Sequence, residues 1–137
     1  MKGTVIENCK PTFFTGRVIH GRKIGRTIGF PTANLQINQE LEEGFLKGVY
    51  GVKVYHKGFM YQGVMNIGVR PTFKDIKPIV SCEVHILDFG QEIYGDSLSI
   101  EVAFFIRDEV AFKSKDQLIQ QLNKDVEIAD KMFLVTK

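Results

Sequence analysis

The period-two alternation of side chains between Ser97 and Arg107 constrains the fold of this chain more than any other feature. Successive residues of a β-strand point to opposite faces of the sheet, so this pattern predicts a long strand with one buried face. The apolar set of alternating positions is Leu98, Ile100, Val102, Phe104 and Ile106. We expect these side chains to share the buried face.

Shorter runs rich in β-branched and aromatic residues predict further strands upstream. The predicted strands cover residues 13–20, 32–37, 48–56, 59–69 and 79–88. The Lys57-Gly58 pair lies between two of them and suits a tight hairpin turn. In the strand over 79–88, Glu83 and His85 fall on the face opposite the apolar positions. We expect His56 at the surface or at a strand end.

After residue 113 the apolar spacing changes to that of a helix. Ser114 and Gln117 form a capping-box pattern, which is typical of a helix N-terminus. The apolar stripe that follows is Leu118, Leu122, Val126, Ala129 and Phe133. We predict a helix from Lys115 to Leu134, with Asn123 as a point where it could break. Several strands followed by one amphipathic helix indicate a mainly β protein, an antiparallel sheet closed into a small barrel with the helix packed against it.

Length and composition limit the class of protein. The chain has 137 residues, 44% of them hydrophobic and 25% charged, as is typical of one globular domain. We expect an N-terminal arm over residues 1–12 and one domain over residues 13–137. The net charge of +2 does not require a nucleic-acid partner, and no apolar run is long enough for a membrane partner. Cys9 and Cys82 are far apart with no metal-binding spacing, so a reducing, cytoplasmic location is expected.

The stretch Gly21–Asn34 carries the clearest candidate for a binding site. Its first part combines regularly spaced glycines with cations: Gly21, Arg22, Lys23, Gly25, Arg26 and Gly29. Glycine lets a ligand approach backbone N–H groups, and such a loop with cations suits a phosphate chain. Thr32 and Asn34 follow as neutral oxygen donors of the kind that Mg²⁺ binds together with phosphate oxygens. The stretch lacks the spacing of a Walker A loop, and a solvated basic surface loop also fits its composition.

Other candidate residues are open to two interpretations. Glu83 suits a general base because a strand holds it in place, but it could equally be a solvated glutamate on the outer face. Arg107 and Phe112 could clamp a planar ring or merely cap the barrel. The Tyr94-Gly95 pair could stack on a ring or form an ordinary turn. The segment Asn66–Gly68 fits turn chemistry at the end of a strand.

In combination these motifs resemble riboflavin kinase (flavokinase). The resemblance covers residues 13–133, and its landmarks follow the order of that family. The landmarks are the Gly21–Leu35 stretch with its Pro-Thr-Ala-Asn element, Gly48-Val49-Tyr50, Asn66–Thr72, Glu83–Phe89, Tyr94-Gly95 and Phe105–Phe112. The Pro-Thr-Ala-Asn element is highly specific to the family.

The resemblance implies a closed six-stranded antiparallel Greek-key barrel with a C-terminal α-helix packed against it. It also implies transfer of the γ-phosphoryl group of ATP, with Mg²⁺ or another divalent cation, to the ribityl 5′-hydroxyl of riboflavin, giving FMN and ADP. In that family's pattern Glu83 is the catalytic base, and Thr32 and Asn34 hold the metal. The implied ATP-binding residues are Gly21, Arg26, Thr32, Ile86, Asp88 and Tyr94. The implied flavin-binding residues are Arg107, Val110 and Phe112, with a backbone contact at Val110.

Many bacterial relatives in this family carry an N-terminal adenylyltransferase domain that makes FAD. Because only residues 1–12 precede the kinase-like part, we expect no FAD synthesis by this chain alone. The chain could be a single-function enzyme or part of a larger bifunctional flavin enzyme. The alternative hypothesis is a small β-barrel that binds nucleic acid or flavin without kinase activity. The short basic patch and the lack of a row of aromatic residues disfavour nucleic acid, and the intact Thr32, Asn34 and Glu83 disfavour a flavin carrier.

Overall fold

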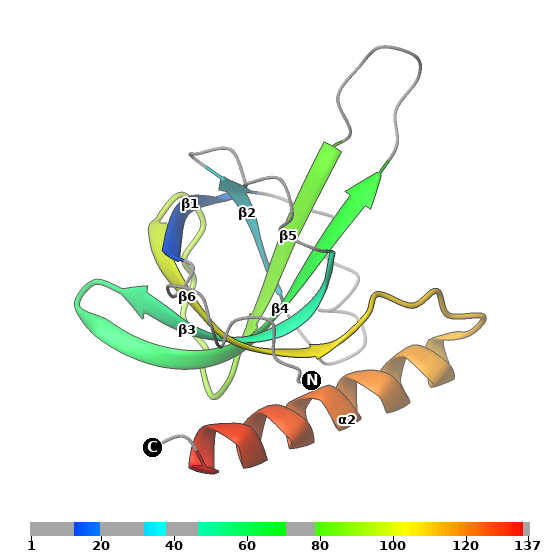
Figure 1. Ribbon diagram of the computed structural model, residues 1–137. Helices are drawn as coiled ribbons and strands as arrows, with labels where there is room; N and C mark the ends of the chain where they lie inside the picture. The colour runs from blue at the N-terminus through cyan, green and yellow to red at the C-terminus, as the bar shows by residue number, and fades with distance from the viewer. Residues whose placement is uncertain (1–12, 20–31, 38–46, 71–78, 136–137) are drawn as a thin grey trace.

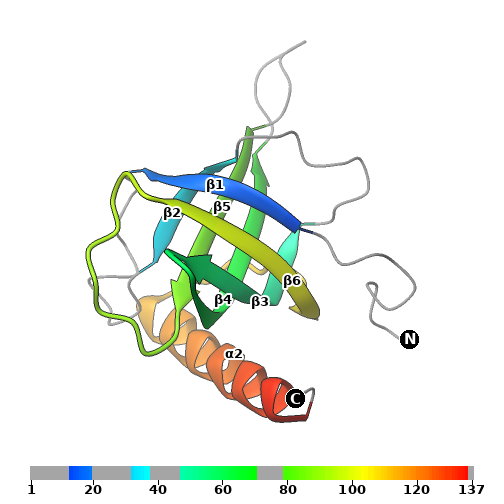
Figure 2. The same ribbon diagram turned by 90° about the vertical axis from the view of Figure 1, so that its left-hand side faces the viewer.

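The structure, a computed structural model, describes residues 13–19, 32–37, 47–70 and 79–135. The elements of this part of the chain are β1 (Phe13–Ile19), β2 (Ala33–Ile37), β3 (Gly48–His56), β4 (Phe59–Arg70), β5 (Ile79–Ile86), β6 (Ser97–Arg107) and α2 (Lys115–Val135). The strands close into a barrel, and α2 runs along its outside (Figure 1). Figure 2 shows the same barrel turned by 90°, with β1 and β6 crossing in front and α2 below.

The strand order around the closed barrel is β1-β2-β5-β4-β3-β6, and all neighbouring strands are antiparallel. β3, β4 and β5 are successive neighbours, and β6 returns to pair with β3, which is a Greek-key arrangement. Closure gives every strand a neighbour on each side, so no strand is an edge along its whole length. The predicted fold class, a mainly β, six-stranded antiparallel Greek-key barrel with a C-terminal helix, is confirmed.

The inside of the barrel is a packed apolar core. Its most buried members include Val52, Val54, Met65, Ile67, Val84 and Ile100. Side chains fill the interior of a barrel of this size, so no space remains there for a ligand. Any binding site must therefore use the outer face of the sheet or the connections at the barrel ends.

The turn after β3 and the end of β5 can be compared with the sequence predictions. Lys57 and Gly58 both have positive φ (48° and 86°), as the tightest hairpin turn requires, so the predicted turn is confirmed. β5 ends at Ile86, earlier than predicted, because Asp88 turns the chain with a φ of 53°. His56 ends β3, which is one of the two placements predicted for it, and its side chain is buried, only 3% exposed.

The predicted alternation along β6 holds only for its first half. The core contains the first three apolar positions, Leu98, Ile100 and Val102. Phe104 and Ile106 instead pack on the outside of the barrel, and Phe105 packs against the inner core. The register between β3 and β6 shifts twice near this point, and such an irregularity exchanges the two faces of a strand. The sequence could not show this exchange because Phe104 and Phe105 are equally apolar.

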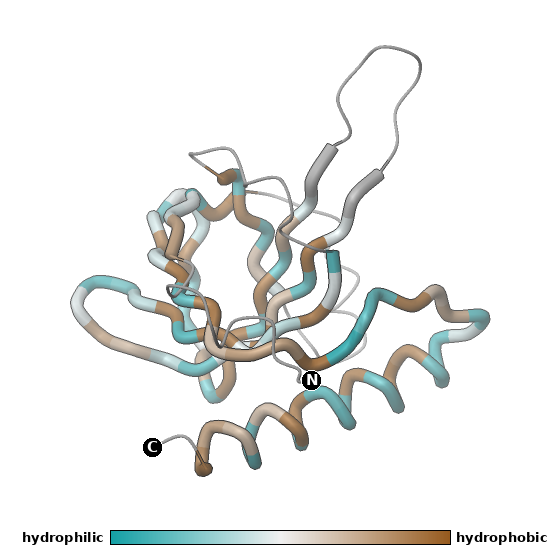
Figure 3. Tube along the Cα trace, viewed as in Figure 1, coloured by the Kyte–Doolittle hydropathy of each residue, from teal (hydrophilic) through white to brown (hydrophobic). Residues whose placement is uncertain are grey.

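α2 begins as predicted and continues without a break at Asn123. The backbone N–H of Gln117 donates to Oγ of Ser114 (3.2 Å), while the Gln117 side chain accepts a hydrogen bond from the backbone N–H of Lys113 (3.1 Å). The cluster between helix and barrel is Val49, Val64, Phe104, Ala129 and Phe133. Figure 3 shows apolar positions interleaved with polar ones along the strands and the helix, as this two-sided packing requires. No helix in the described residues has the length and apolarity needed to cross a membrane.

Candidate active site

Three polar residues lie side by side across the outer face of the sheet. The pairs are Ile19 with Asn34, Asn34 with Glu83, Glu83 with Asn66, Asn66 with Val49 and Val49 with Arg107. Directly paired residues share a face, and their Cβ atoms lie about 5 Å apart. The neighbours of these residues along β2, β4 and β5 point into the core: Ala33, Leu35, Met65, Ile67, Cys82 and Val84. Asn34, Glu83 and Asn66 therefore point outward, and we call them the polar row.

Glu83 is the centre of this row. It lies mid-strand in β5, half-buried, with an amide side chain on either side of it. Oγ1 of Thr32 donates a hydrogen bond of 3.2 Å to its Oε1. This contact orients one carboxylate oxygen and leaves the other able to accept a hydrogen bond from a second donor. Glu83 is thus an outward-facing, half-buried carboxylate with a side-chain partner.

Asn66 flanks Glu83 on the side away from Asn34. The sequence favours turn chemistry at Asn66, but the residue lies inside β4, which continues to Arg70. Its Oδ1 is buried and has no hydrogen-bond partner, the one such side-chain atom found in the described residues. Buried polar atoms are nearly always hydrogen-bonded in folded proteins, so an unpaired one requires an explanation. The signal in the sequence is an amide at an alternating position of a strand, where Asn is disfavoured.

The residues expected to bind the nucleotide gather at one end of the barrel. The backbone N–H of Gly95 donates to the carbonyl of Val18 (2.9 Å), which fixes the β5–β6 connection to the end of β1. Tyr94, 54% exposed, lies on this connection, and Asp88 lies in the turn where it begins. Ile86 is 6% exposed and belongs to the core, so only its backbone is available to a ligand.

Thr32 and Asn34 are close to this end of the barrel because Asn34 pairs with Ile19, the last residue of β1. The predicted phosphate contacts Gly21 and Arg26 lie outside the described residues. Thr32, Asn34 and Glu83 are thus brought together, as the sequence predicts.

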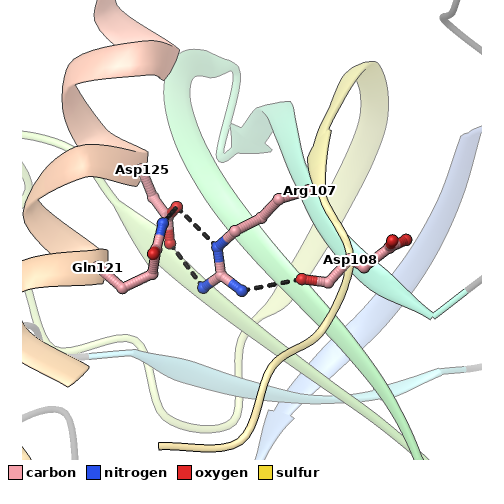
Figure 4. Close-up of polar contacts among 4 residues, drawn as sticks. All are labelled: Arg107, Asp108, Gln121 and Asp125. Carbon is pink, nitrogen blue, oxygen red and sulfur yellow. Dashed lines mark hydrogen bonds and ion pairs between the residues drawn. The ribbon is translucent and has the colours of Figure 1, made fainter. Parts of the chain in front are cut away.

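Arg107, expected to bind flavin, contacts the helix (Figure 4). Its Nε–H donates to Oδ1 of Asp125 and its Nη2–H to Oδ2, both at 2.8 Å. Nη1 donates to the carbonyl of Asp108 (3.0 Å), and Nε2 of Gln121 also donates to Oδ1 of Asp125 (3.0 Å). Asp125 is 1% exposed. Arg107 therefore ties α2 to the end of β6, a structural role alongside the predicted flavin contact.

Val110 and Phe112 lie on the segment that joins β6 to α2. Val110 is 51% exposed, and the Phe112 ring centroid is 5.8 Å from Cζ of Arg107. Arg107 is in the same register row as Asn66, beyond Val49. The residues expected to bind flavin thus lie on the Asn66 side of Glu83, whereas Thr32 and Asn34 lie on its other side. Ile86 and Asp88, also expected to bind the nucleotide, follow Glu83 along the chain at the end of β5. Sequence reasoning missed Asp125, for which the one signal is a carboxylate between the stripe positions of an amphipathic helix.

The oxygen donors beside Glu83 fit a hard divalent cation. No group of three or more His, Cys, Asp and Glu side chains that could hold a metal occurs in the described part of the chain. The Thr32 hydroxyl gives its hydrogen to Glu83, so the lone pairs of its oxygen stay available. Asn34, paired with Glu83, can add an amide oxygen. Mg²⁺ commonly takes few protein oxygens and completes its shell with water and phosphate, which matches such a sparse set of donors.

Fold and site together define the class of protein: a small Greek-key barrel domain with a helix on its outside and an outward-facing, oxygen-rich site. Residues 8–133 match the family described as flavokinase, riboflavin kinase, so the chain belongs to the riboflavin kinase family. The resemblance inferred from the motifs is thereby confirmed.

Curated relatives and solved structures agree with this family. The chain is 47% identical over 125 residues to the bifunctional riboflavin kinase/FMN adenylyltransferase of Haemophilus influenzae, covering 90% of this chain and 39% of that protein. The protein of the same name from Bacillus subtilis is 45% identical over 125 residues, with the same coverage. The chain thus spans 39% of the length of these relatives.

Two solved structures share the fold. A riboflavin kinase from Trypanosoma brucei matches with a TM-score of 0.59 and 25% identity, over 91% of this chain and 81% of that one. A Streptococcus pneumoniae protein described as a macrolide-efflux protein matches with a TM-score of 0.80 and 37% identity. That match covers 88% of this chain but only 38% of the other.

Proposed function

We propose that this chain catalyses the ATP-dependent phosphorylation of the ribityl 5′-hydroxyl of riboflavin, giving FMN and ADP. The observation that carries the proposal is the placement of Glu83. It is half-buried mid-strand, bonded by Thr32 and flanked by two amides, with Asn34 on one side and the residues expected to bind flavin on the other. Membership of the riboflavin kinase family supports the same reaction.

In the proposed reaction Glu83 acts as the general base. The 5′-oxygen forms a bond to the γ-phosphorus, the bond from that phosphorus to the bridging oxygen breaks, and ADP leaves. The hydroxyl proton passes to the carboxylate of Glu83. Phosphoryl transfer has a loose transition state, so positioning and charge stabilisation contribute most of the catalysis. The hydrogen bond from Thr32 fixes the carboxylate for this transfer.

Thr32 and Asn34 are proposed to hold the divalent cation together with the nucleotide. A bound Mg²⁺ would neutralise charge on the β- and γ-phosphate oxygens. Both protein donors are neutral, so they do not reduce the charge that the cation presents to phosphate. Gly21 and Arg26 are proposed to contact the phosphates, and Ile86, Asp88 and Tyr94 the adenosine.

The deciding experiment incubates the purified chain with riboflavin, ATP and Mg²⁺ and separates the flavins by chromatography. We expect FMN, and we expect Glu83→Gln to form it roughly 10²- to 10⁴-fold more slowly, the usual contribution of a general base. Glu101→Gln is the matched control, because Glu101 is also a strand glutamate that accepts a hydroxyl hydrogen bond, from Tyr55 at 2.9 Å. Near-normal turnover by Glu83→Gln would remove Glu83 from this role.

We also propose that this chain alone makes no FAD. Its match to the bifunctional relatives covers 39% of their length, and the family that matches it is the riboflavin kinase. The same chromatogram tests this point, because FAD elutes apart from FMN. An FAD peak that grows with incubation time would contradict it.

A further inference from the structure

The unpaired Oδ1 of Asn66 is the one buried polar side-chain atom in the described residues that the fold leaves without a partner. Leaving such an acceptor without a donor destabilises the folded state, because its bond to water is lost and not replaced. The residue as a whole is half-buried, and its side chain points to the outer face of the sheet. The terminal torsion of Asn is broad, so a turn of the amide can present the oxygen to a ligand.

The strand register indicates which substrate of the proposed reaction lies nearest to Asn66. Asn66 and Asn34 stand on opposite sides of Glu83, one strand away in each direction. Neighbouring strands are about 4.8 Å apart, so the two amides are separated by roughly 10 Å and cannot serve the same ligand atom. Asn34 is on the side of β1, to which Gly95 of the β5–β6 connection is hydrogen-bonded. Asn66 is on the side of β3 and Arg107. Asn66 therefore faces the acceptor that Glu83 deprotonates.

The surface next to Asn66 is also polar and close-fitting. Gly68 is the next outward position along β4, and a Cβ there would lie 2.8 Å from Oε2 of Glu109 and 2.9 Å from Oγ of Ser81. This carboxylate and hydroxyl extend the polar surface beyond Glu83 toward the end of the sheet. A chain of hydroxyl groups matches such a surface, whereas an apolar ring does not.

We propose that Asn66 determines specificity for a polyol acceptor, its Oδ1 accepting a hydrogen bond from a hydroxyl of the chain that Glu83 activates. This inference rests on the proposed function, because the polyol is the ribityl chain of riboflavin. Asn66 touches the substrate but takes no proton from it. The hydroxyl would supply the donor that the buried Oδ1 lacks within the protein.

The test compares riboflavin with lumiflavin, which has the same ring but a methyl group in place of the polyol. Flavin fluorescence titration gives Kd for both ligands with the wild type, Asn66→Ala and Gln62→Ala. Gln62 is the matched control, an amide on the same strand and the same outward face. We expect Asn66→Ala to raise Kd for riboflavin about 3- to 10-fold, the usual effect of one hydrogen bond, and to leave Kd for lumiflavin unchanged. Gln62→Ala should change neither.

Two further measurements separate this role from a structural or metal-binding one. The Tm of Asn66→Ala should equal or exceed that of the wild type, because the substitution removes an unpaired buried acceptor. The Mg²⁺ concentration for half-maximal FMN formation should not change. Equal weakening of both flavins, a lowered Tm or a shifted Mg²⁺ dependence would each overturn the inference.

The two proposals fail in distinguishable ways. FMN formation by the wild type establishes the reaction, and an unchanged riboflavin-to-lumiflavin ratio in Asn66→Ala then overturns only the role of Asn66. If the wild type binds riboflavin but makes no FMN, the proposed function fails. The ratio of the riboflavin and lumiflavin Kd values in Asn66→Ala still tests whether Asn66 binds the polyol. If it binds no riboflavin, both proposals fail.

Discussion

Replacing Asp125 with Ala should be among the most damaging single changes in this protein. Its carboxylate receives two hydrogen bonds from Arg107, both 2.8 Å, and one from Gln121 at 3.0 Å. The Asp125 side chain is 1% exposed and that of Arg107 is 18% exposed. Removing the carboxylate leaves the guanidinium charge without its partner in a place that little water can reach.

The expected cost follows from this burial. Breaking a buried ion pair by removing one partner typically costs about 3–5 kcal/mol. Arg107 keeps some contact with solvent, so we expect the lower part of that range, about 3 kcal/mol. A domain of this size has a total stability of about 5–15 kcal/mol, and each kcal/mol shifts Tm by roughly 3–4 °C. The Asp125→Ala variant should therefore melt about 10 °C below the wild type.

Urea unfolding of four proteins checks this reasoning: the wild type, Asp125→Ala, Arg107→Leu with Asp125→Leu, and the control Asp130→Ala. Asp130 is an exposed carboxylate of the same helix, so its loss should cost little. The double leucine variant should recover most of the stability, because replacing both charges of a buried pair with apolar groups is often neutral. A cost below about 1 kcal/mol for Asp125→Ala would refute the view that this pair holds α2 to the barrel.

Three further changes test the site and the fold. Asn34→Ala should raise the KM for Mg-ATP in steady-state kinetics and leave the Kd for riboflavin unchanged in a fluorescence titration. If Asn34 instead binds riboflavin, the Kd should rise and the KM should stay the same. The hydrogen bond with His56 lowers the pKa of Asp96, so this pair stabilises the protein above the ordinary aspartate pKa of about 3.9, and the contribution is lost as the pH falls through the lower folded value. On acidification, the Tm of Asp96→Asn should therefore fall less than the Tm of the wild type. Parallel plots of Tm against pH for the two proteins would contradict this. A Cβ at Gly51 would overlap the ring of Phe104, so Gly51→Ala should cost about 1–3 kcal/mol in urea unfolding, and an unchanged midpoint would show that the ring moves freely.

Local patterns in the sequence predict most of this fold. β3 has the predicted bounds, 48–56, because its apolar residues alternate and a Lys57-Gly58 turn ends it. The N-terminus of α2 is equally local, since Ser114 caps it through the backbone N–H of Gln117. The polar row follows from the same alternation, because Glu83 and Asn34 are flanked in sequence by residues that point into the core.

Features that depend on distant partners could not be predicted in this way. Arg107 and Asp125 are 18 positions apart, and His56 and Asp96 are 40 apart. Nothing near His56 in the sequence indicates that a carboxylate from the β5–β6 connection will form a hydrogen bond with it. The exchange of faces in β6 is similar, because it results from the changed register against β3 and not from its own alternation.

The outward placement of the polar row has a physical reason. The apolar core fills the barrel, so a carboxylate that meets both substrates of the proposed reaction must lie on the outer face. Phosphoryl transfer needs the donor and the acceptor on opposite sides of the transferred group. A sheet supplies this arrangement directly, because Asn34, Glu83 and Asn66 sit on three adjacent strands whose spacing backbone hydrogen bonds fix. If Asn34 binds the nucleotide side and Asn66 binds riboflavin, the three residues follow the same order across the sheet as donor, transferred group and acceptor do in the reaction. Asn34→Ala should then weaken Mg-ATP binding and Asn66→Ala should weaken riboflavin binding. The opposite pair of results would disprove this arrangement.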